Sequence, residues 1–410
     1  MLSSTTIQIV KSTAPVLAVK GEEITTHFYK TLFTNHPELL NIFNHANQKK
    51  GRQQTALANT IYAAATYIDQ LEVLLPAVKQ IAHKHRSLAV KPEHYPIVGE
   101  HLLDAIKAVL GDAATDEIIE AWGEAYGVIA DVFISVEREM YEAAAQQNAG
   151  WEDFKEFTVA EKIEESELIT SFYLKPSDGS AVPAFTPGQY ITIRISIPGD
   201  TNLFNRQYSL SDASNGEYFR ISVKKENSDP AGAVSNYLHE HVEIGNTVEV
   251  TAPAGDFILE GGQDLPVYLI SGGVGITPML SMLKTIAKEQ PARLTTFIHA
   301  ARNGSVHAFK DEVRETIDIM ENGKKLFIYE NPTDEDVKLG AFHEQGFVTE
   351  QILRTLNLKN DGLYYVCGPV QFIKYIISML GKLGVTEDII RYEFFGPSID
   401  MKKEEEVTVK

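Results

Sequence analysis

The first half of the chain contains one histidine, His85, whose surroundings suggest chemistry. Apolar residues recur around it at helical spacing: Val78, Ile81, Ala82 and Leu88. This stripe predicts that the imidazole points into a helical core, whereas His83 falls on the opposite, polar side of the same helix, near Lys79 and Lys84. Buried histidines are usually satisfied by hydrogen bonds, but an inward imidazole can also be the axial ligand of a haem iron. The stripe alone leaves both interpretations open.

A second group of candidate residues lies in three short segments of the second half. The segments are Gly188-Gln189-Tyr190, Arg206-Gln207-Tyr208-Ser209 and Gly232-Ala233-Val234-Ser235. In this order they resemble the flavin-binding signature of the ferredoxin reductase family. Arg206 can hold a pyrophosphate, and the rings of Tyr190 and Tyr208 can pack on a flavin. Val234 and Ser235 stand where a helix N-terminus would offer backbone N–H groups to phosphate.

A glycine-rich loop follows a short apolar strand. Residues 267–270 form the expected strand, and a helix is predicted over Met279–Ala287. Between them lies the segment Ser271-Gly272-Gly273-Val274-Gly275-Ile276-Thr277-Pro278. A loop in this position brings backbone amides against the pyrophosphate of a dinucleotide. Pro278 replaces the last glycine of the usual dehydrogenase fingerprint, and this form resembles that of the ferredoxin reductase family.

Two further segments resemble parts of that family. Cys367-Gly368-Pro369 is similar to its nicotinamide-side loop, although a cysteine at a strand end is often a small buried thiol. Glu393-Phe394-Phe395-Gly396-Pro397 is similar to the segment that returns to the flavin. Phe395 is our candidate for the ring that covers the flavin, although both phenylalanines could equally pack in a core. Arg302 and the lack of an acidic residue beside it favour tolerance of NADPH over strict use of NADH.

The elements that must position these residues change in character at Gly150 and Trp151. Before this point the apolar residues follow helical periodicity, which predicts an all-α bundle of about six to eight helices. One long helix is expected to begin at Thr115, a good N-cap. After Trp151 the period becomes two, as at Ile191, Ile193 and Ile195, which predicts a small antiparallel barrel over residues 153–260. Strands then alternate with helices.

The helical half resembles a bacterial globin, and the whole chain resembles a flavohaemoglobin. The matching segments are His27-Phe28-Tyr29-Lys30, Asn35-His36-Pro37-Glu38-Leu39, Ile42-Phe43-Asn44, Gln53 to Leu57, Lys84-His85 and Lys91-Pro92-Glu93-His94-Tyr95. The resemblance implies that His85 is the proximal ligand of haem iron, with Lys84 beside it. It places Phe43 on the haem, and Tyr29, Gln53 and Leu57 in the distal pocket.

The implied roles are chemically reasonable. A phenol at Tyr29 and an amide at Gln53 can donate hydrogen bonds to a partly anionic ligand in a dry pocket. On the other side, the family pattern places Tyr95 and Glu137 in a hydrogen-bonded chain to His85. A carboxylate behind an imidazole makes the imidazole a stronger electron donor to iron.

The resemblance implies a multidomain fold with three units. We predict an all-α globin haem domain over residues 1–148, then an antiparallel β-barrel FAD-binding domain over 151–261. An α/β Rossmann-like NAD(P)H-binding domain over 265–400 follows, with a flexible tail at 401–410. The joint at Gly150 and Trp151 is expected to act as a hinge that keeps the haem and flavin edges close.

Composition excludes several classes of protein. The formal net charge of −19 over 410 residues, without a basic run, argues against a nucleic-acid partner. The single cysteine rules out an intrachain disulfide and a cysteine-cluster metal site. The longest apolar stretch near the N-terminus, residues 14–19, is too short for a signal sequence or a membrane span. We therefore expect a cytoplasmic monomer that binds small molecules only.

The combination of sites predicts a reaction. Nicotinamide delivers two electrons together, haem iron accepts one at a time, and a flavin converts between them. The resemblance implies nitric oxide dioxygenase activity, in which NAD(P)H, FAD and haem b convert nitric oxide and O2 to nitrate. Two alternatives remain open from the sequence: a haem-free flavin or ferric reductase, and an oxygen-binding or sensing globin.

Overall fold

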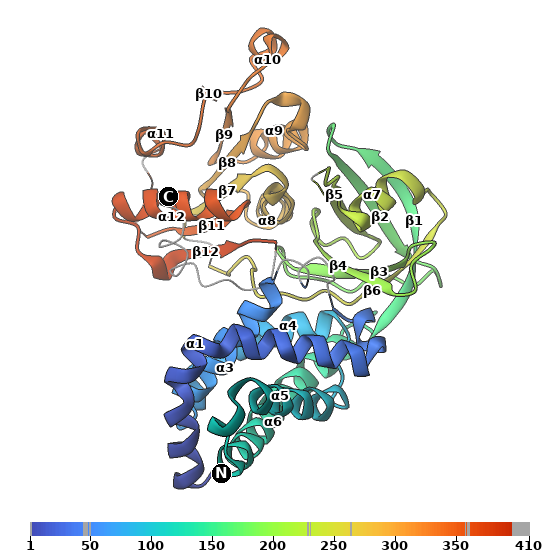
Figure 1. Cartoon of the computed structure of the whole chain (residues 1–410). Helices are drawn as coiled ribbons and strands as arrows, with labels where there is room; N and C mark the ends of the chain where they lie inside the picture. The colour runs from blue at the N-terminus through green and yellow to red at the C-terminus, as the bar shows by residue number, and fades with distance from the viewer. Residues whose placement is uncertain are drawn as a thin grey trace.

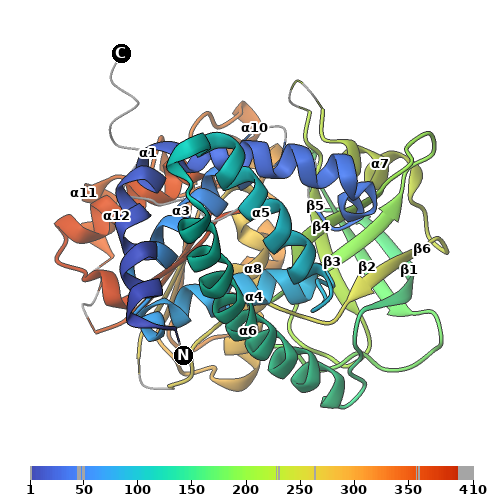
Figure 2. The same ribbon diagram turned by 60° about the horizontal axis from the view of Figure 1, so that its bottom comes forward.

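The computed structural model of the chain describes residues 2–43, 48, 51–227, 229, 231–262, 265–356, 358 and 361–395. Figure 1 shows three units: the helical half lies below, the barrel at the upper right and the α/β unit at the upper left. The view in Figure 2 brings α1, α5 and α6 to the front. Within the described residues, no helix is both long enough and apolar enough to cross a membrane.

The helical half contains five α-helices and three short 3-10 helices within its described residues. The α-helices are α1 (Ser4–Asn35), α3 (Arg52–Thr66), α4 (Leu75–Ser87), α5 (His94–Leu110) and α6 (Asp116–Gln146), and the 3-10 helices are η1 (Pro37–Asn41), η2 (Leu71–Leu74) and η3 (Gly111–Ala113). The predicted start of the long helix is confirmed, because the Thr115 hydroxyl accepts a hydrogen bond from the Ile118 N–H at 3.4 Å. Two acidic residues in its first turn suit the positive end of the helix dipole.

Close packing between α5 and α6 fixes the proximal part of the helical half. A Cβ added at Gly99 would lie only 2.5 Å from Cε1 of Tyr126, so the glycine lets this ring lie directly on α5. The Tyr126 hydroxyl then donates to the Tyr95 carbonyl oxygen at 2.6 Å. The first turn of α5 is thereby tied to α6, and both helices supply residues to the site described below.

The barrel is a six-stranded antiparallel sheet in the order β4-β3-β6-β1-β2-β5. Its elements are β1 (Phe154–Glu164), β2 (Ile169–Pro176), β3 (Tyr190–Ser196), β4 (Leu203–Ser209), β5 (Phe219–Lys224), β6 (Thr247–Thr251) and helix α7 (Ala233–His241). The predicted alternation is confirmed at Ile191, Ile193 and Ile195, which are all buried in the barrel core. A bridge between Leu210 and Ile221 brings the two outer strands together.

The α/β unit is a six-stranded parallel sheet in the order β10-β9-β8-β7-β11-β12. Its strands are β7 (Val267–Gly272), β8 (Thr295–Ala301), β9 (Gly323–Tyr329), β10 (Glu344–Gln345), β11 (Leu363–Cys367) and β12 (Ile390–Glu393). Its helices are η4 (Gly273–Gly275), α8 (Ile276–Glu289), η5 (Gly304–Val306), α9 (Lys310–Asp318), α10 (Asp334–Leu339), α11 (Glu350–Thr355), α12 (Val370–Lys382) and η6 (Glu387–Ile389).

The two faces of this sheet carry different helices. Leu269 packs with α8 and α9 on one face, whereas Ile270 packs with α12 on the other, because successive side chains of a strand point in opposite directions. The strand order reverses between β7 and β11. Ligands of open α/β sheets bind at such a reversal, beyond the carboxyl ends of the strands.

The joint between the helical half and the barrel is firmly held. The Trp151 indole N–H donates to the Val250 carbonyl oxygen at 3.2 Å, and the ring packs against the barrel core. A Cβ at Gly150 would lie 2.0 Å from the Ala144 carbonyl oxygen, so only glycine fits there. These contacts hold the joint in place, and its role in keeping the haem and flavin edges close stays a prediction.

Candidate functional site

One large cavity runs between the helical half and the barrel. Its volume is about 520 Å³, and it extends from α1 and α3, past α4, to β3, β4 and the end of β12. The helical part of its lining is mostly apolar, with Leu57, Ile81, Val98 and Phe133 among its residues. The barrel part is more polar and includes Tyr190, Arg206, Gln207 and Ser209. We call this space the shared cavity.

His85 lies on the last turn of α4 and lines the shared cavity. Its Nδ1 atom is 2.7 Å from Oε1 of Glu137, which is only 2% exposed. Because a carboxylate can only accept, Nδ1 carries the proton, and the Nε2 lone pair is left for a metal. The predicted stripe is confirmed: Ile81 and Leu88 line the cavity with His85, and Val78 and Ala82 are buried.

Tyr95 completes the arrangement behind His85. Its hydroxyl donates to Oε1 of Glu137 at 2.6 Å and lies 3.2 Å from Nδ1 of His85. Burial, followed by the Glu137 charge, raises the pKa of Tyr95, so its phenol stays protonated and keeps donating. A hydrogen-bonded carboxylate that fixes the tautomer and orientation of a histidine is typical of metal ligation.

The predicted distal residues also line the shared cavity. Tyr29, Phe43, Gln53 and Leu57 all line it. Burial raises the pKa of Tyr29, whose ring contacts that of Phe43 at a centroid distance of 5.8 Å. Among the described residues, buried Oε1 of Gln53 has no hydrogen-bond partner. An imidazole from α4 and polar side chains from α1 and α3, within a mostly apolar space, fit a haem.

The barrel end of the cavity fits a flavin. Tyr190 lies on β3, and its buried hydroxyl has no hydrogen-bond partner within the described part of the chain. Arg206 lies on β4, where its Nη1 donates to the Asn205 carbonyl oxygen at 2.7 Å. Burial lowers the pKa of Arg206. A guanidinium has five N–H donors, so Arg206 retains others that can meet a phosphate. Gln207 and Ser209 line the same end.

Three predicted flavin residues lie away from the shared cavity. Tyr208 is half-buried and packs against the barrel core, and Val234 is part of that core. Ser235 lies in the first turn of α7, where its hydroxyl donates to the Gly232 carbonyl oxygen and accepts from the Glu226 N–H, both at 3.2 Å. Their roles toward a cofactor stay predictions.

The predicted nicotinamide residues come together at the strand-order reversal. Gly273, Val274 and Gly275 form η4, and Ile276, Thr277 and Pro278 form the first turn of α8. A Cβ at Gly275 would lie 2.3 Å from the Cys367 carbonyl oxygen, so this loop contacts the end of β11 directly. Gly368 and Pro369 lead from there into α12. Burial raises the pKa of the Cys367 thiol, which therefore stays protonated.

The end of β12 returns to the shared cavity. Glu393, Phe394 and Phe395 line it, and Phe395 is 47% exposed. Burial raises the pKa of Glu393 to about 7, against the opposing effect of the Lys84 charge. Phe394 also packs on the core shared with α12, so the core interpretation holds for this residue. The predicted residues Gly396 and Pro397 lie outside the described residues.

The seam between α4 and the barrel contains residues that the sequence prediction missed or misplaced. His83 was expected on a polar side, but it is half-buried, and its Nδ1 accepts from the Gly255 N–H at 3.3 Å. Arg86 donates to barrel carbonyls, and the Ser87 hydroxyl accepts from Gln207 Nε2 at 2.7 Å. The prediction was wrong because the polar face of an amphipathic helix can cover another domain as well as face water. The one available signal in the sequence was that His83, Arg86 and Ser87 lie within two residues of the candidate ligand His85.

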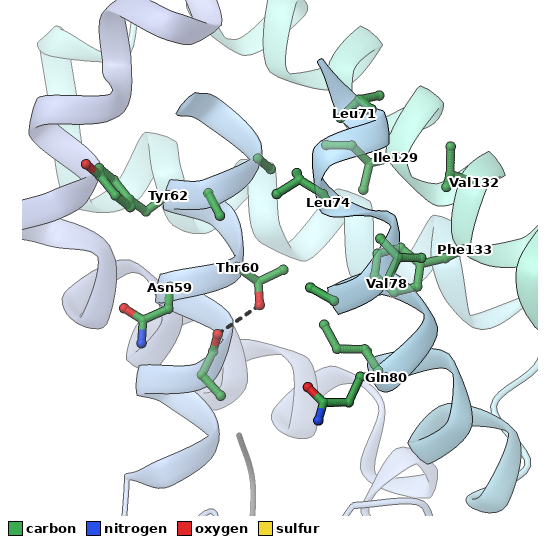
Figure 3. Close-up of a pocket in the computed structure, with 15 residues that line it drawn as sticks. Asn59, Thr60, Tyr62, Leu71, Leu74, Val78, Gln80, Ile129, Val132 and Phe133 are labelled. Carbon is green, nitrogen blue, oxygen red and sulfur yellow. Dashed lines mark hydrogen bonds between the residues drawn. The ribbon is translucent and has the colours of Figure 1, made fainter. Parts of the chain in front are cut away.

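A smaller apolar cavity adjoins the first. It measures about 460 Å³ and lies between α3, η2, α4 and α6, as Figure 3 shows. It shares Ala56, Thr60, Ile81 and Phe133 with the shared cavity. The Thr60 hydroxyl donates to the Ala56 carbonyl oxygen at 2.9 Å, so its polar atom is satisfied within α3. None of the described residues that line this cavity is charged.

The chain matches three protein families in succession. These are Globin over residues 26–133, the oxidoreductase FAD-binding domain over residues 156–258 and the oxidoreductase NAD-binding domain over residues 269–377. Among curated relatives, a Flavohemoprotein from Bacillus thuringiensis subsp. konkukian is 57% identical over 404 residues, which cover 98% of this chain and 100% of the relative.

Two solved structures are also similar. A flavohemoglobin from Malassezia yamatoensis with bound FAD and heme has a TM-score of 0.85 and 29% identity, covering 96% of this chain and 100% of its own. The FAD/NAD-binding domain of a nitric oxide dioxygenase from Vibrio cholerae has a TM-score of 0.54 and 42% identity, covering 60% of this chain and 100% of its own. The likeness therefore extends over all three units.

Proposed function

The chain belongs to the flavohaemoprotein family, and from this premise we propose that it is a nitric oxide dioxygenase. Membership of this family makes the chain an oxidoreductase that uses haem, FAD and NAD(P)H. The proposed reaction converts nitric oxide and O2 to nitrate with electrons from NAD(P)H. A related FAD/NAD-binding domain from Vibrio cholerae, 42% identical, carries the name nitric oxide dioxygenase.

The observation that carries the proposal is the shared cavity. The proposed iron ligand His85 and the proposed flavin residues Tyr190 and Arg206 line one continuous space. A chain that only stored oxygen would have no use for a flavin site opening onto its haem site. Repeated turnover requires the iron to be reduced again after each cycle, and a direct opening between the two sites provides for this.

The residues on each side of the cavity perform separate tasks. When bound, the flavin takes two electrons from the nicotinamide and passes them singly to the haem. Glu137 holds the proton on Nδ1 of His85, so the Nε2 lone pair would be available as a strong donor to a haem iron bound in the cavity. Tyr29 and Gln53 would offer hydrogen-bond donors to a ligand in the same cavity. The apolar residues around them exclude water.

The arrangement favours this function over the two alternatives. A haem-free flavin or ferric reductase would not need the buried Glu137 carboxylate behind His85. An oxygen-binding or sensing globin would not need the glycine loop of η4 or the flavin end of the cavity.

Nitric oxide consumption by the full-length holoprotein tests the proposal. With NADH and oxygen present, an electrode trace should show rapid loss of nitric oxide and formation of one nitrate for each nitric oxide consumed. Omitting either oxygen or the nicotinamide should stop the loss. Nitric oxide loss at the same rate without oxygen, or no loss at all, would contradict the proposal.

Three finer expectations stay predictions within this proposal. Tolerance of NADPH rests on Arg302, which is exposed just after β8. Comparing initial rates with NADH and NADPH, in the wild type and in Arg302→Ala, tests it. A cytoplasmic location and a monomeric state are tested by cell fractionation and by sedimentation of the holoprotein.

A further inference from the structure

Arg86 is a buried arginine at the seam between the helical half and the barrel. It is only 6% exposed and follows His85 directly in the last turn of α4. Its Nη1 donates to the Ala252 carbonyl oxygen at 3.4 Å, and its Nη2 donates to the Pro253 carbonyl oxygen. Both acceptors belong to the segment that follows β6. One side chain therefore joins the proposed ligand turn to the barrel.

The surroundings of this guanidinium are unusual for a buried charge. Within the described residues, no carboxylate lies at ion-pair distance from Arg86, and the barrel partners are neutral carbonyl groups. Burial accordingly lowers the pKa of Arg86. Burying a charge without a countercharge is costly, and the position near the negative end of the α4 dipole offsets only part of that cost. The energetic cost of burying Arg86 is explained if the residue fixes the position of the last turn of α4 against the barrel.

The contacts continue on both sides of Arg86. On the helix side, the Tyr141 hydroxyl donates to the carbonyl oxygens of Arg86 at 3.4 Å and Val90 at 2.8 Å, which holds the end of α4 against α6. On the barrel side, Ala254 and Tyr190 exchange two backbone hydrogen bonds of 2.8 Å. The path from His85 to the proposed flavin residue Tyr190 is therefore short and bonded throughout.

We propose that Arg86 is a positioning residue. It holds the last turn of α4, which carries His85, at a fixed position relative to Tyr190 in the proposed flavin site. The inference rests on the proposed function, because it concerns electron transfer between the two sites. Ser87 supports the same seam through the hydrogen bond from Gln207. Arg86 itself does not line the shared cavity, so it acts through the segments that it joins.

The test separates two rates in the full-length holoprotein. Mixing the anaerobic oxidised protein with NADH in a stopped-flow instrument gives the rate of flavin bleaching and then the rate of haem reduction. Arg86→Gln should leave flavin bleaching unchanged and slow haem reduction by up to about a hundredfold, the loss that a misplacement of about 1 Å can cause. Arg86→Lys, which keeps a charged donor, should recover part of the loss.

Arg293→Gln is the matched control. Arg293 is 4% exposed and also donates to neutral acceptors, the Leu265 carbonyl oxygen at 2.8 Å and Gln290 Oε1 at 2.9 Å, but it lies in the α/β unit. This variant should leave the rate of haem reduction at the wild-type value. A slowing as large as that in Arg86→Gln would mean that loss of any buried arginine has this effect, and would overturn the proposal.

Hydrogen exchange provides a readout that does not depend on turnover. In Arg86→Gln, the amides of Ala252, Ala254 and Gly255 and those of the last turn of α4 should exchange faster, while those of β7 and β8 should not. Unchanged exchange at the seam together with an unchanged rate of haem reduction would overturn the proposal. Failure of the wild type to reduce its haem with NADH would instead contradict the proposed function, and exchange would still decide whether Arg86 holds the seam.

Discussion

His85 in the helical half and His299 in the α/β unit differ in what holds their Nδ1 atoms. Nδ1 of His85 lies 2.7 Å from the Glu137 carboxylate, and the rest of the ring faces the shared cavity. Nδ1 of His299 lies 2.8 Å from the Ser271 hydroxyl, and its ring centroid lies 4.4 Å from that of the tilted His307 ring. His307 in turn bonds the Tyr329 hydroxyl at 2.8 Å.

The difference shows that enclosure alone does not mark a metal ligand. His299 is 1% exposed and has no open face, and burial lowers its pKa to about 3. It is a neutral core residue whose partner is also neutral. His85 combines a charged partner on one nitrogen with open space at the other. That combination, and not burial, separates a ligand from a packed histidine.

The largest expected effect comes from removing the proposed ligand. His85→Ala should abolish haem binding, because it removes the imidazole whose Nδ1 is held by the Glu137 carboxylate. Flavin bleaching by NADH should persist. The contrasting variant, His299→Ala, should keep its haem and lose only stability. Haem content by absorption, measured beside the bleaching rate, checks both variants, and a normal Soret band in His85→Ala would refute the assignment.

A smaller effect should follow from neutralising the partner of His85. Glu137→Gln keeps the shape of the side chain but removes its charge, so the imidazole becomes a weaker donor. We expect a loss of about 10- to 100-fold in haem affinity or haem-dependent turnover. Glu139→Gln, an exposed residue on the same helix, is the matched control and should behave as the wild type. Equal behaviour of Glu137→Gln and Glu139→Gln would contradict the conclusion that a charged partner on Nδ1 distinguishes His85 from His299.

A third effect concerns His299 and the dependence of folding stability on pH. The folded state keeps this imidazole neutral down to a pKa of about 3, whereas the unfolded chain takes up a proton below about 6.5. The unfolded state therefore binds more protons between these values, so stability is lost as pH falls through this window. His299 alone should lower the free energy of unfolding by about 1.4 kcal/mol for each pH unit within this window.

Calorimetry at several pH values between 4 and 7 would test this effect. His299→Gln, which cannot titrate, should show a shallower loss of stability with falling pH than the wild type. The comparison concerns the slope, because the substitution also changes the absolute stability. Parallel slopes in the two proteins would show that His299 does not remain neutral in the folded state.

Much of the fold follows from local patterns in the sequence. The helical stripe around His85, the alternation at Ile191 to Ile195 and the strand–glycine–helix order at Gly273 are each confirmed by the structure. These features succeed because periodicity and turn chemistry are properties of neighbouring residues. The position of Glu137 behind His85 came from the family resemblance, since a single glutamate on a long helix carries no local signal.

The seam could not be predicted in this way. His83 and Arg86 belong to the polar face of α4, and local patterns cannot show whether such a face meets water or another domain. The acceptors of Arg86 are main-chain carbonyls of Ala252 and Pro253, and no side-chain pattern identifies them. Contacts between backbone and distant side chains depend on how whole units dock, which periodicity does not encode.

We propose that electrons pass from the nicotinamide site through the flavin to a haem iron held by His85 within one chain. The most direct measurement is anaerobic mixing of the oxidised holoprotein with NADH while both cofactors are followed by absorption. Flavin bleaching should be followed by conversion of ferric to ferrous haem, at a rate that does not depend on protein concentration. Flavin bleaching with an unchanged ferric Soret band, or haem reduction that becomes faster with protein concentration, would contradict it.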